Sequence, residues 1–337
     1  MTVDMRRREF ITLLGSTGIA WPLTAHAQQP GQAQQPGRVK RIGVLMSLPG
    51  TDVEAPLRLA AFLQRLQELG WTDRRNMRID YRLAESDMLQ SVAAAQVALA
   101  PDVLVVNGSS ALKAARAATR TIPIVFENVI DPVGQGFVTS LEHPGGNITG
   151  LSNIESEMGD KWLRLLKEIA PQVTEVAVIG ADLGGGAGIV GAIRAQAPSR
   201  RVKLVNASAL IAASEIEHVF SELARQSNTG LVVLPGPLTL SHRKQIIALA
   251  ARSRLPAVYP YRYYVTDGGL MSYGVDTADA YRRAATFVDR ILKGEKPGNL
   301  PIERATKFEL VINLQTAKTL GIQVPPTLLE EADEVIE

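Results

Sequence analysis

The sequence predicts an α/β protein built from two doubly wound lobes, each a parallel β-sheet covered by helices, with a hinge joining the lobes. Three observations lead to this prediction. Short runs rich in β-branched residues alternate with amphipathic helical patterns from residue 41 onward. The same alternation begins again near residue 175. The chain has 337 residues, which is more than one hydrophobic core usually serves.

Composition and charge exclude several classes of function. The 36 Lys and Arg nearly balance the 34 Asp and Glu, whereas a nucleic-acid-binding protein normally shows a basic excess, so we expect no nucleic-acid partner. The chain has no Cys, which excludes disulfides, thiolate metal sites and a lipid-modified cysteine anchor. Its four His are scattered, and it contains no Walker loop, Gly-x-Ser-x-Gly elbow or His-Glu-x-x-His motif. We therefore expect no metal, no cofactor and no enzymatic activity.

The first 27 residues have the layout of an export signal. Three arginines at 6–8 precede an apolar run at 11–23, and the segment ends in Ala25-His26-Ala27, with small residues where a signal peptidase cleaves. Arg7-Arg8-Glu9-Phe10-Ile11 fits the twin-arginine (Tat) pattern, with a plain secretory (Sec) signal as the alternative. The apolar run is too short for a stable membrane anchor. We predict cleavage near Ala27 and a periplasmic protein without membrane insertion after processing.

A Gln/Pro-rich segment at 28–37 follows, which we expect to be a disordered tether before the first lobe. The lobe itself shows four buried-strand patterns separated by three amphipathic helical patterns. In chain order, the expected strands are 42–46, 78–83, 103–106 and 123–126, and the expected helices are 55–69, 87–99 and 110–118.

The second half of the chain repeats this order. Its expected strands are 175–179, 202–205, 231–234 and 256–259, and its expected helices are 189–197, 214–225 and 242–253. The halves also share a detail, because each enters a strand through a Pro, a residue tolerated at a strand's first position. Two such lobes place the loops at the carboxyl ends of both sheets around a shared cleft, where sheets of this kind bind ligands.

The loop Asn107-Gly108-Ser109-Ser110 is a candidate ligand site between a strand and a helix. Backbone N–H groups and two hydroxyls at a helix N-terminus suit a carboxylate or another anion, with ordinary helix capping as the alternative. Ser110 and Lys113 also match the Ser-x-x-Lys motif of penicillin-recognising enzymes, but the chain lacks that family's partner motifs. Further along, Asp131 before Pro132 is expected to cap a helix.

Two other loop features bear on the cleft. Five of the seven Tyr fall between 259 and 273, and we expect Tyr259 and Tyr273 to contact a ligand because each borders an apolar run; packing against the protein is the alternative. The glycines at 186, 188 and 191 spell a dinucleotide fingerprint, but they follow the strand too late. We interpret 182–188 as a cleft loop.

Five sequence blocks occur in the order found in one known family. They are Ile122-Pro-Ile-Val-Phe126 through Asp131-Pro-Val133, Pro144-Gly-Gly-Asn-Ile-Thr-Gly-Leu-Ser152, Leu255-Pro-Ala-Val-Tyr259, Gly268-Gly-Leu-Met-Ser-Tyr-Gly274 and Thr306-Lys-Phe-Glu-Leu-Val-Ile-Asn313. Through them, residues 38–337 resemble the substrate-binding proteins of ABC transporters, in the tryptophan/tyrosine-type family, which have the type I periplasmic binding protein fold.

The resemblance implies a domain organisation with three crossovers between the lobes. They are expected near 150–153, 272–276 and 299–309. The first lobe would comprise 38–151 plus about 275–300, and the second 152–274 plus about 301–337.

The resemblance also implies a ligand site in the cleft. Members that bind an aromatic amino acid hold its carboxylate on a first-lobe loop, which matches residues 107–110 here. Ser47 and Asn128 would line the same lobe, and Pro235, Gly236 and Tyr273 would face them from the other lobe.

The implied function is that of a periplasmic receptor for an ABC importer. It would capture a small solute, best an aromatic or branched amino acid or a related carboxylate, and present it as a monomer to a membrane permease and its ATPase. The alternative is an exported ligand-sensing module that signals to a membrane partner without transporting the ligand.

Overall fold

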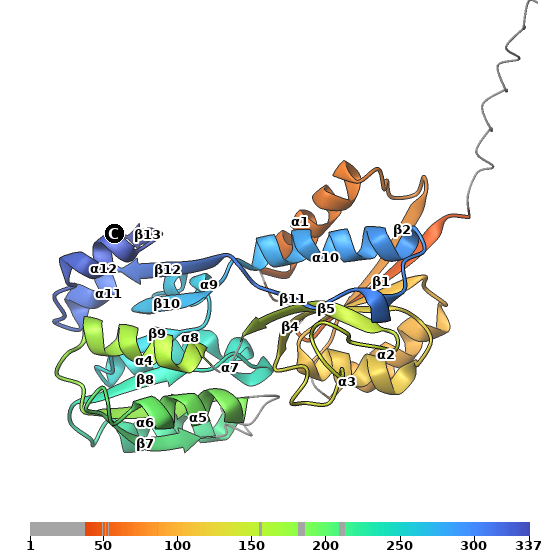
Figure 1. The fold of residues 1–337 in the computed structure, drawn as a ribbon. Helices are drawn as coiled ribbons and strands as arrows, with labels where there is room; N and C mark the ends of the chain where they lie inside the picture. Colours follow the sequence, from red (N-terminus) through yellow and green to blue (C-terminus); the bar gives the residue numbers. More distant parts are fainter. Residues whose placement is uncertain are drawn as a thin grey trace, which may run out of the picture. The chain divides into compact units, whose positions relative to one another are not determined.

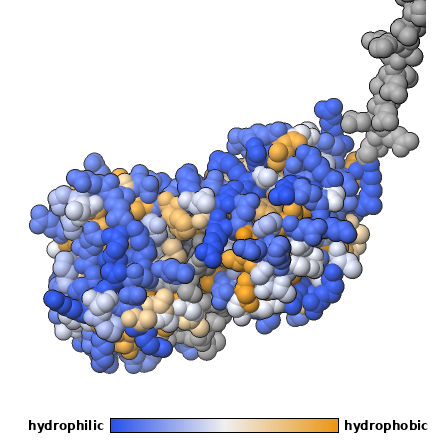
Figure 2. Space-filling model, viewed as in Figure 1, coloured by the Kyte–Doolittle hydropathy of each residue, from blue (hydrophilic) through white to orange (hydrophobic). Residues whose placement is uncertain are grey.

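The computed structural model describes residues 38–48, 50, 52, 54–85, 87–154, 157–180, 186–208 and 213–337. The expected signal peptide and tether lie outside the described residues, so both stay predictions. Within the part that the structure describes, no helix is both long and apolar enough to cross a membrane. The face in Figure 2 is mostly hydrophilic and is interrupted by small hydrophobic areas, as is usual for a surface in contact with water.

Two β-sheets organise the chain, one in each lobe (Figure 1). The first has the strand order β11-β5-β4-β3-β1-β2 and is parallel throughout its described strands. The second has the order β13-β12-β10-β9-β8-β6-β7, in which β10 and β12 pair antiparallel. The predicted fold of two parallel-sheet α/β lobes is therefore confirmed. The strands are β1 Lys40–Met46, β2 Met77–Leu83, β3 Val103–Asn107, β4 Ile124–Ile130, β5 Ile148–Ile154, β6 Glu175–Ile179, β7 Lys203–Ser208, β8 Thr229–Val233, β9 Ala257–Tyr259, β10 Met271–Val275, β11 Glu303–Arg304, β12 Phe308–Asn313 and β13 Glu334–Ile336.

Helices cover both faces of the first sheet, because successive residues of its buried strands point to opposite sides. Val44 belongs to the core cluster that contains Phe62 of α1, whereas Leu45 belongs to the one that contains Leu112 of α3. In Figure 1, α1 and α10 lie on one face, and α2 and α3 on the other. The helices are α1 Glu54–Glu68, α2 Leu89–Ala98, α3 Ser109–Ala118, α4 Met158–Ile169, α5 Gly186–Gln196, α6 Ala213–Leu223, α7 Pro237–Ser241, α8 Arg243–Arg252, α9 Arg262–Thr266, α10 Thr277–Leu292, α11 Leu314–Thr319 and α12 Pro326–Glu331, with a 3₁₀ turn at Pro297–Asn299.

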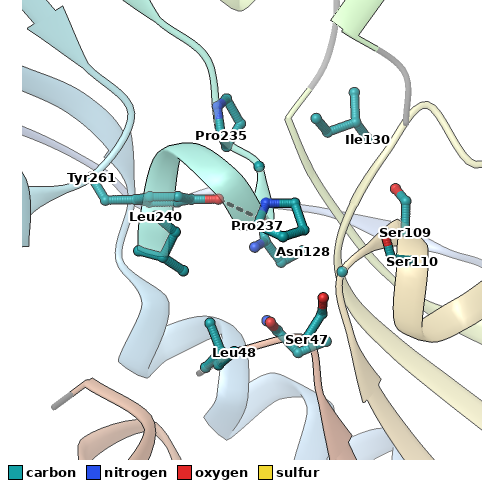
Figure 3. Close-up of a pocket in the computed structure, with 13 residues that line it drawn as sticks. Ser47, Leu48, Ser109, Ser110, Asn128, Ile130, Pro235, Pro237, Leu240 and Tyr261 are labelled. Carbon is teal, nitrogen blue, oxygen red and sulfur yellow. Dashed lines mark hydrogen bonds between the residues drawn. The ribbon is translucent and has the colours of Figure 1, made fainter. Parts of the chain in front are cut away.

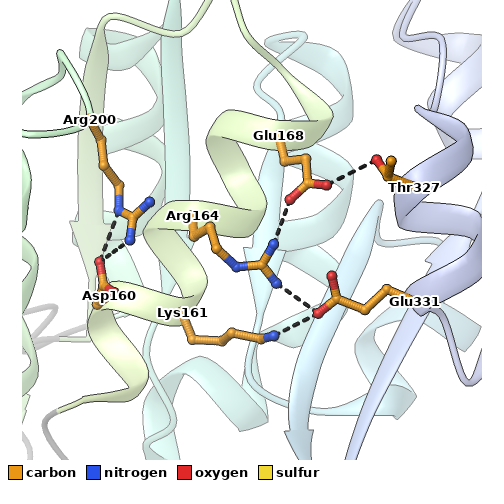
Figure 4. Close-up of polar contacts among 7 residues, drawn as sticks. All are labelled: Asp160, Lys161, Arg164, Glu168, Arg200, Thr327 and Glu331. Atoms are coloured by element: carbon orange, nitrogen blue, oxygen red, sulfur yellow. Dashed lines mark hydrogen bonds and ion pairs between the residues drawn. The ribbon is translucent and has the colours of Figure 1, made fainter.

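The C-terminal segment is attached to the second lobe by polar contacts between α12 and α4 (Figure 4). Glu331 accepts hydrogen bonds from Lys161 Nζ at 2.6 Å and from Arg164 at 2.7 Å. Arg164 also pairs with Glu168 at 2.6 Å, and Glu168 accepts a bond from Thr327 Oγ1 at 3.1 Å. These linked pairs join α12 to α4, and β13 at the end of the chain pairs with β12.

The chain crosses between the lobes after β5, after β10 and between β11 and β12. Glu303 and Arg304 of β11 pair with Leu151 and Ser152 at the edge of the first sheet. The last crossing therefore lies between Arg304 and β12, within the range 299–309 expected for it. Glu303 and Arg304 belong to the first sheet, although the second lobe was expected from about 301. A two-residue edge strand has no sequence pattern that would have marked it.

Two local predictions are wrong. Asp131 does not cap a helix, because β4 extends to Ile130 and Asp131, at φ 41°, begins a turn in which its Oδ1 accepts a 2.8 Å bond from the Gly134 amide. Helix α5 begins at Gly186, within the expected cleft loop at 182–188, and residues 181–185 lie outside the described residues.

We predict that Gly274→Ala destabilises the crossover after β10. An added Cβ would lie 1.7 Å from the carbonyl oxygen of Pro260, so the backbone must move, at a cost of about 1–3 kcal/mol in the free energy of unfolding. Gly191→Ala is the matched control, since its added Cβ would meet nothing within 4 Å beyond its chain neighbours and the backbone of its own helix, and alanine favours the helix by up to about 1 kcal/mol. Urea unfolding followed by circular dichroism should show a lower midpoint for Gly274→Ala alone; equal midpoints for the two variants would contradict this.

Candidate functional site

A cavity of about 500 Å³, counting the part open to solvent, lies where the carboxyl ends of strands from both sheets face each other (Figure 3). Thirteen residues line it, and none of these thirteen has a charged side chain. They are Ser47, Leu48, Asn107, Gly108, Ser109, Ser110, Asn128, Ile130, Pro235, Gly236, Pro237, Leu240 and Tyr261.

The start of α3 forms one wall of the cavity. Gly108 has φ 88° and ψ 154°, a conformation that only glycine adopts readily, and its amide donates to the Glu127 carbonyl at 2.9 Å. This bend starts the helix at Ser109. The first N–H groups of a helix have no partner within the helix, and Gly108 at the N-cap has no side chain to cap them. The wall therefore offers backbone donors and the positive end of a helix dipole.

Hydroxyl groups add to this wall. Ser47, at the end of β1, is 6% exposed, and its Oγ has no hydrogen-bond partner among the described residues. A buried hydroxyl without a partner is uncommon, so Ser47 Oγ is free to bond a group that enters the cavity. Ser109 Oγ accepts a 3.1 Å bond from Gln135 Nε2 and keeps its own proton for donation.

A bulge in β4 directs Asn128 toward the cleft. The register between β4 and β5 shifts between Phe126 and Val129, and Asn128 has φ 58°, a left-handed conformation that asparagine tolerates. The buried Glu127 accepts a bond from Asn107 Nδ2. Asn128 Oδ1 accepts a 2.6 Å bond from Tyr261 Oη of the second lobe. The bulge thus positions Asn128 for a hydrogen bond with Tyr261 that joins the two lobes.

The second lobe contributes a mainly apolar wall. Pro235, Pro237 and Leu240 belong to the segment from the end of β8 into α7, and Tyr261 follows β9. Tyr261 is 4% exposed. A polar wall on one lobe thus faces an apolar wall on the other, which suits a ligand with a polar end and an apolar body.

Eight of the ten residues predicted for the site line this cavity. They are Ser47, Asn107, Gly108, Ser109, Ser110, Asn128, Pro235 and Gly236.

Tyr259 and Tyr273 do not line the cavity, contrary to expectation. Tyr259 lies inside β9, where it is 1% exposed and its ring stacks on Tyr264 at 5.2 Å. Tyr273 stacks on Phe308 at 5.7 Å and lies under Lys161 Nζ at 4.7 Å, in a different groove. Tyr261 lines the cavity instead, because it lies beyond the end of the strand, where the chain turns into the cleft. The one sequence feature that could have indicated Tyr261 as a lining residue is its position just beyond the apolar run of β9.

Comparisons with known proteins agree with the two-lobe fold. Residues 51–336 match the family described as ABC transporter substrate binding protein. A curated tyrosine-binding protein from Clostridioides difficile (strain R20291) is 28% identical over 312 residues, which are 91% of this chain and 88% of the relative. The structure of a conserved domain protein from Vibrio cholerae is 29% identical with a TM-score of 0.82, over 88% of this chain and all of that chain (100%). The same fold occurs in the structure of an ABC domain from Streptococcus pneumoniae in complex with L-Trp. That structure is 24% identical with a TM-score of 0.81, over 88% of this chain and 99% of that chain.

Five tyrosines are buried in the fold, four of them in β9, in α9 or in the turn between the two, and one of these four, Tyr261, lines the cavity. Rings of Tyr261 and Tyr263 stack at 5.2 Å, and those of Tyr263 and Tyr264 at 5.4 Å. Burial is the main cause that raises the pKa of each phenol above its ordinary value of 10.0. The five are Tyr259, Tyr261, Tyr263, Tyr264 and Tyr281.

We predict that alkali unfolds the protein as these tyrosines ionise. The unfolded chain releases their protons near pH 10, whereas the folded protein retains them. The folded state therefore binds more protons, and the free energy of unfolding falls as the pH rises above about 10. Tyrosinate absorbance and circular dichroism, recorded across the same pH range, should change together.

Tyr259→Phe provides the control, because it removes one titrating group and keeps the ring. The fall in stability above pH 10 should become shallower by about 1.4 kcal/mol per pH unit, the value for one proton. Full tyrosinate absorbance with an unchanged dichroism spectrum would contradict the prediction.

Proposed function

The chain belongs to the ABC transporter substrate-binding protein family, and we propose that it captures an aromatic amino acid, best L-tyrosine, in the cavity between its lobes. The family consists of binding proteins, not enzymes. In this proposal the protein is exported, its signal is cleaved near Ala27, and it delivers the amino acid as a monomer to an ABC permease and its ATPase. A sensing module would use the same cavity, but the family match favours transport.

The start of α3 is the observation that carries the proposal. The carboxylate of an amino acid would lie against the backbone N–H groups at Ser109 and Ser110, with the buried Ser47 hydroxyl as an added donor. Helix N-termini stabilise anions through unpaired N–H groups and the helix dipole. Since no lining residue is cationic, these neutral donors would bind the carboxylate.

The opposite wall fits an aromatic side chain. Pro235, Pro237 and Leu240 provide apolar surface, and Tyr261 combines an aromatic ring with a hydroxyl. Asn128 Oδ1 has a second lone pair that could accept a bond from the ligand's ammonium group. The curated relative that binds tyrosine, 28% identical over most of both chains, supports the same class of ligand.

We predict that L-tyrosine stabilises the purified protein against heat. Ligand that binds only the folded state at a concentration 100 times its dissociation constant adds about 2.7 kcal/mol to the free energy of unfolding. Tyramine, which lacks the carboxylate, should give no shift in a thermal-shift assay, because it has nothing to bond the start of α3. If no aromatic or branched amino acid raises the melting temperature, the proposed ligand class is wrong.

We predict that Ser47→Ala weakens the binding of L-tyrosine without destabilising the fold. Its Oγ has no partner to lose within the described structure, so the free energy of unfolding should change by less than about 0.5 kcal/mol. Loss of one hydrogen bond to a charged carboxylate should weaken binding in calorimetry by about tenfold.

Ser272→Ala is the matched control. Ser272 Oγ is also buried and without a partner among the described residues, but Ser272 does not line the cavity. The Ser272→Ala variant should bind L-tyrosine with the affinity of the wild type. Equal affinities for Ser47→Ala and the wild type would remove Ser47 from the site.

A further inference from the structure

Four residues form a second contact between the lobes, beside the cavity but outside its lining. Asp52, just before α1, and Arg58 of α1 belong to the first lobe. Arg243 of α8 and Tyr263 of α9 belong to the second. All four are buried, with exposed fractions of 8% or less. Burying charged and polar side chains costs free energy unless they pair with one another. The placement of these four residues therefore requires an explanation.

Asp52 and Arg243 face each other across the interface. Asp52 Oδ1 accepts bonds from the amides of Glu54 and Ala55, both at 2.9 Å, which fixes the carboxylate at the start of α1. Its Oδ2 has no hydrogen bond among the described residues but lies 3.6 Å from Arg243 Nη1. The Arg243 Nε donates to Asp267 Oδ2 at 2.6 Å within the second lobe. Each partner is thus held in position by its own lobe.

The ring of Tyr263 completes the contact. The guanidinium carbon of Arg58 lies 5.5 Å from its centroid and that of Arg243 lies 5.3 Å away, so one cation from each lobe borders the ring. Both distances are within the range of a cation–π interaction, which is stronger when the groups are shielded from water. Burial alone would lower the pKa of Arg58, but Tyr263, Tyr281, Glu127 and Asp52 raise it overall, so this side chain stays charged.

These contacts do not require a ligand, because none of the four residues lines the cavity. These contacts form only while the two lobes are together. Separation of the lobes would expose Asp52 and Arg243 to water. Since each lobe already orders its own side chains, little conformational entropy is lost when the lobes meet. The charges are also shielded from salt, which screens buried pairs much less than exposed ones.

We propose that Asp52, Arg58, Arg243 and Tyr263 form a latch that holds the lobes closed in the absence of ligand and so sets the affinity of the cavity. This rests on the proposed function, in which the cavity binds a ligand between the lobes. The apparent dissociation constant equals the intrinsic one divided by the fraction of protein in the binding-competent form. Residues that never touch the ligand therefore control how tightly it binds.

Asp52→Asn tests the latch while it preserves the helix cap, since the amide oxygen can still accept bonds from residues 54 and 55. The chain has no Cys, so spin labels can be attached to Met88→Cys in the first lobe and Gln226→Cys in the second, both exposed. Pulsed electron paramagnetic resonance on the ligand-free protein should show longer distances between the labels in Asp52→Asn. L-tyrosine should bind about tenfold more weakly and dissociate faster.

Two controls separate the latch from general damage. Asp160→Asn removes a carboxylate from Arg200 within the second lobe, where neither residue belongs to the latch, and should leave the label distances unchanged. Tyr263→Leu should open the ligand-free protein, whereas Tyr263→Phe, which keeps the ring, should not. Unchanged distances in both Asp52→Asn and Tyr263→Leu would overturn the latch. If the distances lengthen but L-tyrosine does not bind the wild type, the proposed ligand fails and the latch stands.

Discussion

Parallel pairing in the first sheet is the constraint on which the cavity depends. Met46 pairs with Asn107, and Asn107 pairs with Glu127, so β1, β3 and β4 reach the same level at one edge of the sheet. The residues just beyond this level, Ser47, Gly108 and Asn128, are therefore brought together although the chain separates them widely. A shift of one residue in any of these pairings would turn the polar side chains away from the cleft.

Two departures from regular backbone adapt this edge to a ligand. The conformation of Gly108 frees the first turn of α3, and the bulge at Asn128 turns an amide toward the other lobe. The central strands β1 and β3 are otherwise ordinary, with buried aliphatic residues on both faces. The scaffold thus supplies rigidity, and a few positions at the strand ends supply recognition, which is the usual division in α/β proteins.

Periodic hydrophobic patterns were sufficient to predict both lobes and the loop at 107–110, whereas Ser47, Asn128, Pro235 and Gly236 were expected from the family resemblance. The patterns did not predict the extension of β4 to Ile130, because Glu127 and Asn128 interrupt its apolar run and look like a loop. They also favoured Tyr259 over Tyr261, since a pattern does not fix the last residue of a strand. The meeting of Asp52 with Arg243 depends on how two lobes pack, and a pairing between distant segments leaves no local signal in one sequence.

The three crossovers have a consequence for how the chain is made. Helix α10 and strand β11 complete the first lobe, where α10 packs on α1, β3, β4 and β5, yet they follow β6 to β10 of the second lobe in sequence. During synthesis the second sheet can begin to pair while the first lobe still lacks its last helix. Until α10 emerges from the ribosome, the side chains that it covers on the first sheet stay exposed, and a chaperone that recognises apolar strands would find them accessible.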